Sequence, residues 1–255
     1  MGYGVKVTIL GCGTSGGVPK MPEHWGACDP QNPKNRRLRA SILVEQGDST
    51  IVVDTTPDFR AQMLAASVQK LDAVFYTHDH ADHVHGIDDL RGFFHLTREK
   101  VPVYSDAQTL SVIKQRFDYI FRSQAGYPAM CRAVELSGSP TKIGELKVIP
   151  FEQGHGDGLS LGYRFGDFAY STDLNKLPET AFEALAGVKV WVVDALRYKP
   201  HPTHSHLEQT LKWIERVKPE KAILTHMTWD MDYDTLQKAL PSGVEPAYDG
   251  MVIEL

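Results

Sequence analysis

A run of histidine and aspartate side chains directly after an apolar, strand-like segment constrains this chain more than any other feature. In LDAVFYTHDHADHVHG, four candidate metal ligands fall within six residues: His78, His80, Asp82 and His83. In an extended loop, His78 and His80 project to the same side. If a helix begins near Asp82, its carboxylate and His83 turn toward a second, adjacent centre. The spacing therefore predicts two divalent metal ions, for which zinc, manganese or iron suits imidazole and carboxylate ligands.

Three further candidate ligands each stand just beyond a predicted strand: His155 in EQGHGDG, Asp173 in YSTD and His226 in ILTHM. Rigid strands can deliver such side chains to one rim, while the loops beyond them leave room for a substrate. Taken singly, each residue would more often be a loop, turn or strand-end residue. The prediction that they bind metal therefore depends on the whole set.

Strand-like and helix-like segments alternate along the chain, which is typical of an α/β protein. The predicted strands are 5–10, 40–46, 50–54, 71–77, 101–105, 145–151, 159–165, 167–172, 189–195, 221–225 and 251–255, and the first of them is expected at a sheet edge. The predicted helices are 57–66, 83–94, 106–117, 178–185, 206–217 and 233–240. Two such mixed halves predict a four-layer αββα sandwich, formed by one domain that spans residues 1–255.

The segment from Tyr119 to Ser139 is the least regular part of the sequence, with Gly126, Pro128 and Gly138 spread along it. A loop of that length in a compact protein is commonly a lid or a substrate loop. A plain surface excursion is an equally good interpretation, and the sequence leaves both open.

Composition limits the possible binding partners and the expected cellular compartment of the protein. A net charge of -5 does not attract long phosphate backbones, so small substrates are expected rather than long nucleic acid. A local basic cluster, Lys34, Arg36, Arg37 and Arg39, is interpreted as a solvated loop, with contact to a phosphate as the alternative. No apolar run is long enough to cross a bilayer, and the first residues lack the features of a signal peptide, so a cytoplasmic location is expected. The cysteines Cys12, Cys28 and Cys131 are expected to be free thiols.

The run His78, His80, Asp82, His83 resembles the H-x-H-x-D-H signature of the metallo-β-lactamase superfamily. The resemblance implies that His78, His80 and His155 hold one metal, that Asp82, His83 and His226 hold the other, and that Asp173 bridges them. Asp54, which ends TIVVD, matches the superfamily's first motif. There it would orient a ligand histidine, because metal ligands need hydrogen-bonded partners that fix their tautomer.

A second motif, HPTHSHLEQTLKWIERVKPEKAILTHM, together with the closing AYDGMVIEL, resembles the cyclic phosphodiesterases of the carbon-phosphorus lyase pathway and, more distantly, ribonuclease Z. The resemblance implies a small, cyclic or nucleotide-like phosphodiester substrate, attacked by a metal-bridging hydroxide. Asp82 and His204 are the predicted catalytic residues, and His204 would assist the leaving oxygen. His201 and His206 are alternatives for that role. Dimers are common in this superfamily, so a homodimer is a further expectation.

The chain departs from that family near its N-terminus, where phosphonate-pathway members carry a cysteine-rich zinc site. Only Cys28 remains of the cysteine cluster, and Trp229 stands where a histidine would be expected. His24 and Cys28 alone cannot complete a four-coordinate site, so no structural zinc is predicted. The departure also weakens the transfer of the exact substrate. Because the superfamily includes several reactions, two other functions stay open: a thioesterase or lactonase of the glyoxalase II kind, and a non-hydrolytic diiron protein.

Four remaining features are assigned structural roles. The sequence GCGTSG has the spacing of a dinucleotide-binding loop, but Pro19 and Pro22 follow where its helix should run, so that reading is rejected. Its glycines are expected to let the backbone turn near the metal rim. His85 and His95 are expected to be packed or solvated, and Asp249 to shape the final turn.

Overall fold

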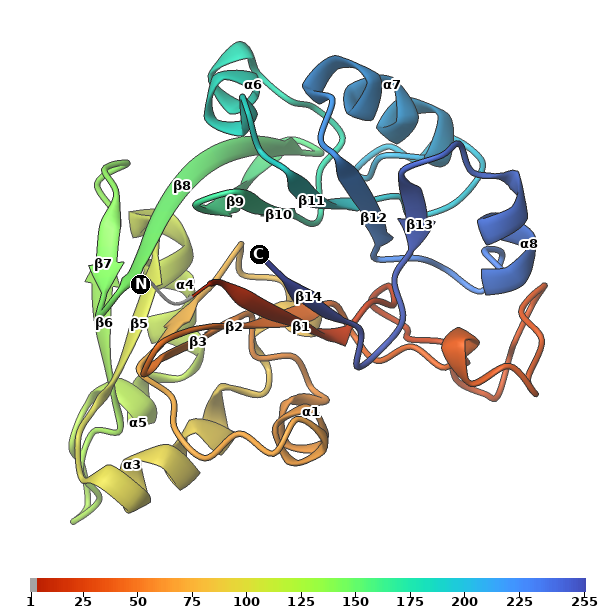
Figure 1. Ribbon diagram of the computed structural model, residues 1–255. Helices are drawn as coiled ribbons and strands as arrows, with labels where there is room; N and C mark the ends of the chain where they lie inside the picture. Colours follow the sequence, from red (N-terminus) through yellow and green to blue (C-terminus); the bar gives the residue numbers. More distant parts are fainter. Residues whose placement is uncertain (1–3) are drawn as a thin grey trace.

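Two mixed β-sheets pack face to face between outer helices in the computed structural model, which describes residues 4–255 (Figure 1). This arrangement confirms the predicted αββα sandwich. The first sheet has the order β14-β1-β2-β3-β4-β5-β6. Its strands are β1 (Lys6–Gly11), β2 (Ser41–Gln46), β3 (Ser49–Val53), β4 (Ala73–Phe75), β5 (Val101–Ser105), β6 (Cys131–Glu135) and β14 (Val252–Glu254).

The second sheet has the order β13-β12-β11-β10-β9-β8-β7. Its strands are β7 (Thr141–Ile143), β8 (Leu146–His155), β9 (Gly158–Phe165), β10 (Phe168–Ser171), β11 (Val190–Asp194), β12 (Lys221–Thr225) and β13 (Val244–Pro246). Strands β7 to β10 are joined antiparallel, whereas β10 to β13 run parallel. The parallel strands consequently end at the same edge of the sheet.

The helices cover the outer faces of the two sheets. Figure 1 shows α1, α3 and α5 outside the first sheet, and α6 and α7 outside the second. The helices are η1 (Pro33–Asn35), α1 (Phe59–Ala65), α2 (Ala81–Val84), η2 (Ile87–Leu90), α3 (Arg91–Thr97), α4 (Ala107–Arg116), α5 (Asp118–Phe121), α6 (Glu179–Leu185), α7 (Leu207–Val217) and α8 (Tyr233–Ala239). None of the helices in residues 4–255 combines the length and the apolar character that a membrane span requires.

Strand periodicity explains the two hydrophobic cores. On β2, Ile42 and Val44 point into the core between the sheets, while Leu43 between them points to the core beneath the helices. Successive strand residues face opposite sides of a sheet, so a strand with both faces buried reads as a continuous apolar run. Burial of these side chains stabilises the fold by about 25 cal/mol for each Å² of apolar surface removed from water.

Three details of the fold differ from the sequence prediction. The first strand is not at an edge, because β14 pairs with its outer side. The segment from Tyr119 to Ser139, predicted to be the least regular part of the chain, contains the end of α5 and all of β6, which pairs in parallel with β5. The helix predicted over 83–94 is divided into α2, η2 and α3.

Gly86 explains the division of that helix. Its N–H donates to Thr55 O at 2.8 Å, so the backbone lies directly against the loop that follows β3. A Cβ atom at Gly86 would lie 2.1 Å from Thr56 O and 2.6 Å from the Cβ of Phe59. Only glycine permits this approach, which places α2 beside the end of β3.

We expect Gly86→Ala to lower the free energy of unfolding by about 1–3 kcal/mol, because the added methyl group overpacks a site bounded by backbone. Gly92 on α3 is the matched control, since a Cβ there would meet no atom within 4 Å. Gly92→Ala should raise the free energy of unfolding by up to about 1 kcal/mol, through helix propensity. Denaturant unfolding of both variants measures this. Equal stabilities would show that Gly86 does not hold the loop contact.

Candidate metal centre

The seven predicted ligands lie together at one edge of the sandwich, supplied by several segments. The loop after β4 carries His78 and His80, and the short helix α2 carries Asp82 and His83. Asp173 and His226 follow the parallel strands β10 and β12, and His155 is the last residue of β8. Ligand sites of open α/β sheets commonly form where the carboxyl ends of parallel strands meet.

Three groups of described side chains could hold a metal ion: two contain the seven predicted ligands and share one residue, and the third is Asp194, His204 and His226. The first group is His78, His80, His155 and Asp173, and the second is Asp82, His83, Asp173 and His226. Within each group the ligand atoms lie within 4.8 Å of one another. This division matches the one that the sequence resemblance implies, with Asp173 common to both groups.

The carboxylate of Asp173 presents one oxygen to each group. Its Oδ2 lies 3.7 Å from His78 Nε2 and 3.9 Å from His155 Nε2. Its Oδ1 lies 3.2 Å from His83 Nε2 and 3.3 Å from His226 Nε2. Ligands at 2.0–2.1 Å from a tetrahedral zinc ion are separated by about 3.3 Å. The two Oδ1 distances match this separation, whereas the two Oδ2 distances are longer.

Unpartnered buried nitrogens show that the residues fit a metal. His78 Nε2 and both ring nitrogens of His226 are buried and have no hydrogen-bond partner among the described residues. A buried polar group without a partner costs about 1–3 kcal/mol. A divalent ion at each group would engage His78 Nε2 and His226 Nε2, and the imidazole and carboxylate donors are those that zinc and manganese accept.

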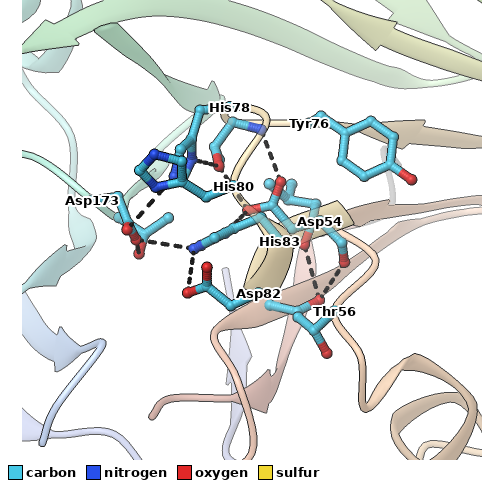
Figure 2. A network of polar contacts seen from close by, with 12 residues as sticks. Asp54, Thr56, Tyr76, His78, His80, Asp82, His83 and Asp173 are labelled. Carbon is cyan, nitrogen blue, oxygen red and sulfur yellow. Dashed lines mark hydrogen bonds and ion pairs between the residues drawn. The ribbon is translucent and has the colours of Figure 1, made fainter. Parts of the chain in front are cut away.

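Hydrogen bonds to the far side of the rings orient the histidines. His83 Nδ1 donates to Asp54 Oδ2 at 2.7 Å, and Figure 2 shows that this leaves the other nitrogen facing Asp82 and Asp173. The N–H and hydroxyl of Thr77 both donate to the same Asp54 carboxylate. Asp54 thus lies where the sequence predicted a group that orients a ligand histidine.

His155 is oriented in the same way by a backbone group. Its Nδ1 donates to Thr203 O at 2.8 Å, so Nε2 carries the lone pair that could bind a metal and lies 3.3 Å from His80 Nδ1. Burial and the neighbouring charge of His83 hold the pKa of His78 well below its usual range, and burial also lowers the pKa of His155. Both imidazoles are therefore neutral, which is the form that binds metal.

The second group concentrates negative charge. Although burial opposes ionisation of Asp173, the charges of His226 and His83 hold its pKa well below the usual range. Burial also opposes protonation of His83, but Asp173, Asp82 and Asp54 raise its pKa well above the usual value. Buried carboxylates in such a cluster need a compensating cation. A proton on His83 Nε2 supplies one positive charge, and a divalent ion bound there would replace that proton and supply two.

Three residues of the site have left-handed backbone conformations: Asp54 at φ 66°, Asp173 at φ 53° and His226 at φ 58°. Asp and His are among the few non-glycine residues that adopt this region with any frequency. Each instance costs about 1–3 kcal/mol. Asp54 and His226 directly follow β3 and β12, and Asp173 stands two residues after the end of β10. The left-handed turn at each position directs the side chain toward the ends of the strands.

Of the three alternatives for the catalytic histidine, His204 is the one that contacts the candidate metal ligands. Its ring stacks on that of His226 with centroids 4.9 Å apart, and its Nδ1 lies 3.8 Å from Asp173 Oδ2. His201 contacts His204 with ring centroids 5.2 Å apart, while its Nδ1 accepts from the N–H of Thr203. His206 instead takes the position before the first turn of α7.

Asp194, the last residue of β11, was missed in the sequence analysis. Its fully buried carboxylate accepts from His204 Nδ1 at 3.1 Å through Oδ2. Although burial opposes protonation of His204, this hydrogen bond and the charges of Asp173 and Asp194 raise its pKa to about 9. The segment KVWVVD has the same pattern, an apolar strand followed by Asp, as the segments that end in Asp54 and Asp173. The sequence therefore contained a pattern that could have identified Asp194 as a site residue.

The segment after His226 is anchored by a buried arginine. Arg37, predicted to be solvated, is 1% exposed, and that prediction is wrong for this member of the basic cluster. Its guanidinium donates to Met231 O at 2.6 Å and to Thr228 O at 3.1 Å, and lies 3.9 Å from Cys28 Sγ. The three cysteines are buried free thiols.

The glycine-containing loop GCGTSG lies beside the metal rim, as expected. The N–H of Met227, next to His226, donates to Cys12 O at 2.9 Å. Asp249 holds this loop in place, accepting from the N–H of Cys12 at 3.1 Å and from the N–H of Leu38 at 2.7 Å. His85 and His95 are exposed and contact the aromatic rings of Phe117 and Phe94.

Known proteins are similar to this chain in sequence and in fold. The Beta-lactamase superfamily domain matches residues 49–227. A crystal structure described as a new diphosphatase from the PhnP family is 36% identical, covers 100% of this chain and 98% of its own, and superposes with a TM-score of 0.93. The short form of human tRNase Z is 15% identical over 97% of this chain and 98% of its own, with a TM-score of 0.68, which shows a shared fold.

Two curated proteins are also similar. The octanoyltransferase of Porphyromonas gingivalis (strain ATCC BAA-308 / W83) is 32% identical over 252 residues, which cover 97% of this chain and 51% of that protein. The ribonuclease Z of Bradyrhizobium sp. (strain ORS 278) is 29% identical over 142 residues, covering 52% of this chain and 46% of that protein. The chain thus spans about half the length of the first of these and matches less than half of the second. It belongs to the metallo-β-lactamase superfamily, in the branch that includes the PhnP-family diphosphatase and ribonuclease Z.

Proposed function

We propose that the protein is a dinuclear metal-dependent phosphodiesterase that acts on cyclic or small nucleotide-like phosphodiesters. The observation that carries this proposal is the His204–Asp194 pair, which stands against the candidate metal ligands Asp173 and His226. A histidine held in this way suits general acid catalysis at an oxygen leaving group. The similarity to a PhnP-family diphosphatase and to ribonuclease Z supports phosphorus as the reacting atom.

The proposed ligand sets follow the two groups in the structure. His78, His80 and His155 would hold one divalent ion and Asp82, His83 and His226 the other, with Asp173 shared by the two sets. Two such ions would make a water molecule more acidic and neutralise charge on the phosphoryl oxygens. Asp82 contributes to catalysis as a ligand, with its Oδ2 3.3 Å from His83 Nε2 and 3.8 Å from His226 Nε2.

His204 supplies the proton for the leaving oxygen. Its Nδ1–H donates to Asp194, which fixes the ring and leaves Nε2–H as the proton that can be transferred. A histidine with a raised pKa holds that proton at neutral pH. The stacked ring of His226 keeps the imidazole of His204 next to the metal ligands, where the phosphorus would be placed.

We expect Asp54→Asn to weaken metal binding by about 10–100-fold, because the amide cannot replace the carboxylate that accepts from His83 and Thr77. Competition with a chromophoric chelator measures the affinity for zinc and manganese. Asp48→Asn, in the exposed turn between β2 and β3, is the control and should leave the affinity unchanged. An unchanged affinity in Asp54→Asn would remove Asp54 from the site.

His204→Ala should lower kcat for a phosphodiester by about 10²–10⁴-fold through loss of proton transfer. His201→Ala is the matched control on the same loop and should keep most of the activity. Metal content, measured on both purified variants, should stay at the wild-type value. Full activity in His204→Ala, or a comparable loss in His201→Ala, would contradict the assignment to His204.

The similarity to an octanoyltransferase keeps acyl chemistry as the second candidate, in the form of a thioesterase or lactonase that uses the same metal residues. A panel separates the candidates: bis-(p-nitrophenyl) phosphate, cyclic nucleotides, a phosphoribosyl cyclic phosphate, a diphosphate diester, thioesters and lactones, each with zinc- or manganese-loaded protein. Faster hydrolysis of the phosphorus compounds would support the phosphodiesterase. Hydrolysis confined to thioesters or lactones would replace it with the second candidate.

A further inference from the structure

The carboxylate of Asp194 faces two histidine rings, those of His204 and His226. The two rings are stacked, with centroids 4.9 Å apart and an angle of 15° between their planes. Each ring presents Nδ1 to one oxygen of the carboxylate. His204 Nδ1 lies 3.1 Å from Oδ2, and His226 Nδ1 lies 4.0 Å from Oδ1. The same carboxylate therefore stands beside the predicted proton donor and a predicted metal ligand.

Both atoms of the longer contact are buried and unpartnered. Asp194 is fully buried and His226 is 1% exposed. Neither Asp194 Oδ1 nor His226 Nδ1 makes a hydrogen bond to any residue in the described range 4–255. Buried polar atoms without partners are destabilising, and native structures satisfy nearly all of them. An interaction between these two atoms would satisfy both.

The role of His226 as a ligand determines which of its nitrogens carries hydrogen. Its Nε2 lies 3.3 Å from Asp173 Oδ1 and 3.8 Å from Asp82 Oδ2, so Nε2 faces the second group of candidate ligands. When Nε2 of a neutral imidazole binds a metal ion, the hydrogen is on Nδ1. That buried N–H needs an acceptor, and Asp194 Oδ1 is the carboxylate oxygen that faces it.

The separation between Asp194 Oδ1 and His226 Nδ1 suits a hydrogen bond through one water molecule. A direct N–H···O bond joins atoms about 2.7–3.2 Å apart, whereas one bridging water joins groups about 4–5 Å apart. Thr225 offers a further partner, because it pairs in register with Asp194 between β11 and β12 and its hydroxyl is buried and unpartnered among the described residues. A buried water typically makes about three hydrogen bonds to such groups.

Other hydrogen bonds hold Asp194 in place. Its Oδ2 also accepts from the N–H of Leu174, the residue after the shared ligand, at 3.3 Å. Its main-chain oxygen accepts from the hydroxyls of Ser205 and Thr210 at 2.7 and 2.6 Å. These bonds tie the end of β11 to the segment after β10 and to the loop before α7. The carboxylate is consequently fixed relative to both histidine rings.

We propose that Asp194 is a positioning residue for the metal ligand His226 as well as for His204. Through a bound water it accepts the Nδ1–H of His226 and keeps Nε2 directed at the second group of ligands, as Asp54 does directly for His83. The inference rests on the metal-binding part of the proposed function and does not depend on the reaction. One carboxylate thus sets the metal affinity and the position of the proton donor.

Metal affinity tests this inference without turnover. We expect Asp194→Ala to weaken the binding of one of the two zinc ions by about 10–100-fold, because the acceptor that orients a ligand histidine is lost. Competition with a chromophoric chelator measures both affinities, and near-ultraviolet circular dichroism checks that the variant is folded. Unchanged affinities in the folded variant would overturn the inference. A third zinc ion per chain that is absent from Asp194→Ala would also overturn it, because Asp194 would then be a ligand itself.

Two further variants separate the carboxylate from its surroundings. Thr210→Val is the matched control, since it removes a buried hydroxyl that donates to the main-chain oxygen of Asp194 and leaves the carboxylate intact. Its zinc affinities should equal those of the wild type. In a His204→Ala background, Asp194→Ala should weaken zinc binding by the same factor as in the wild type. An equal loss in Thr210→Val, or no loss in the His204→Ala background, would contradict a direct role of the carboxylate.

The ring nitrogens of His226 provide a test that requires no change at Asp194. Nuclear magnetic resonance of zinc-loaded protein labelled with ¹⁵N-histidine should show zinc at Nε2 of His226 and a slowly exchanging hydrogen on Nδ1. Zinc at Nδ1, with hydrogen on Nε2, would overturn the inference. If no zinc binds at His226, the proposed function fails as well. If zinc binds there and Asp194→Ala retains its affinity, only this inference fails.

Discussion

The carboxylate of Asp173 is the interaction on which the site depends. One of its oxygens faces His78 and His155, and the other faces His83 and His226, so it joins residues from both sheets. This requires the end of β10 to meet the loop after β4 across the sandwich. The face-to-face packing of the sheets, with apolar side chains filling the space between them, holds the two ends at that separation.

The strands and the candidate ligand groups could be predicted from sequence, because apolar runs and a known motif mark them, whereas contacts that no motif marks could not. His78 to His83 are close in the chain, and the strands are marked by their apolar runs. The pairing of Asp194 with His204 joins residues ten apart through an irregular loop, which periodicity does not describe. The short strand β6 was missed because its residues are only partly buried, so it lacks a clear apolar pattern.

Arg37 and Gly86 show why residue type alone does not predict burial or the end of a helix. A charged residue in a basic run is normally solvated, yet Arg37 is buried because backbone carbonyls of the segment after His226 accept its hydrogen bonds. Gly86 interrupts a helical pattern because the loop after β3 occupies the space where a side chain would lie. In both cases the deciding partner is distant in sequence, and both residues fix backbone that carries candidate ligands.

The pairing of β14 with β1 has a consequence for the order in which the chain folds. Residues 252–254 form the outer strand of a sheet whose other strands all lie before residue 136. During synthesis the second sheet is made before that outer strand leaves the ribosome, and until then β1 presents an open edge. Contacts of such sequence separation slow folding. The nascent first half therefore passes through an interval in which strand addition by another chain competes with its own closure.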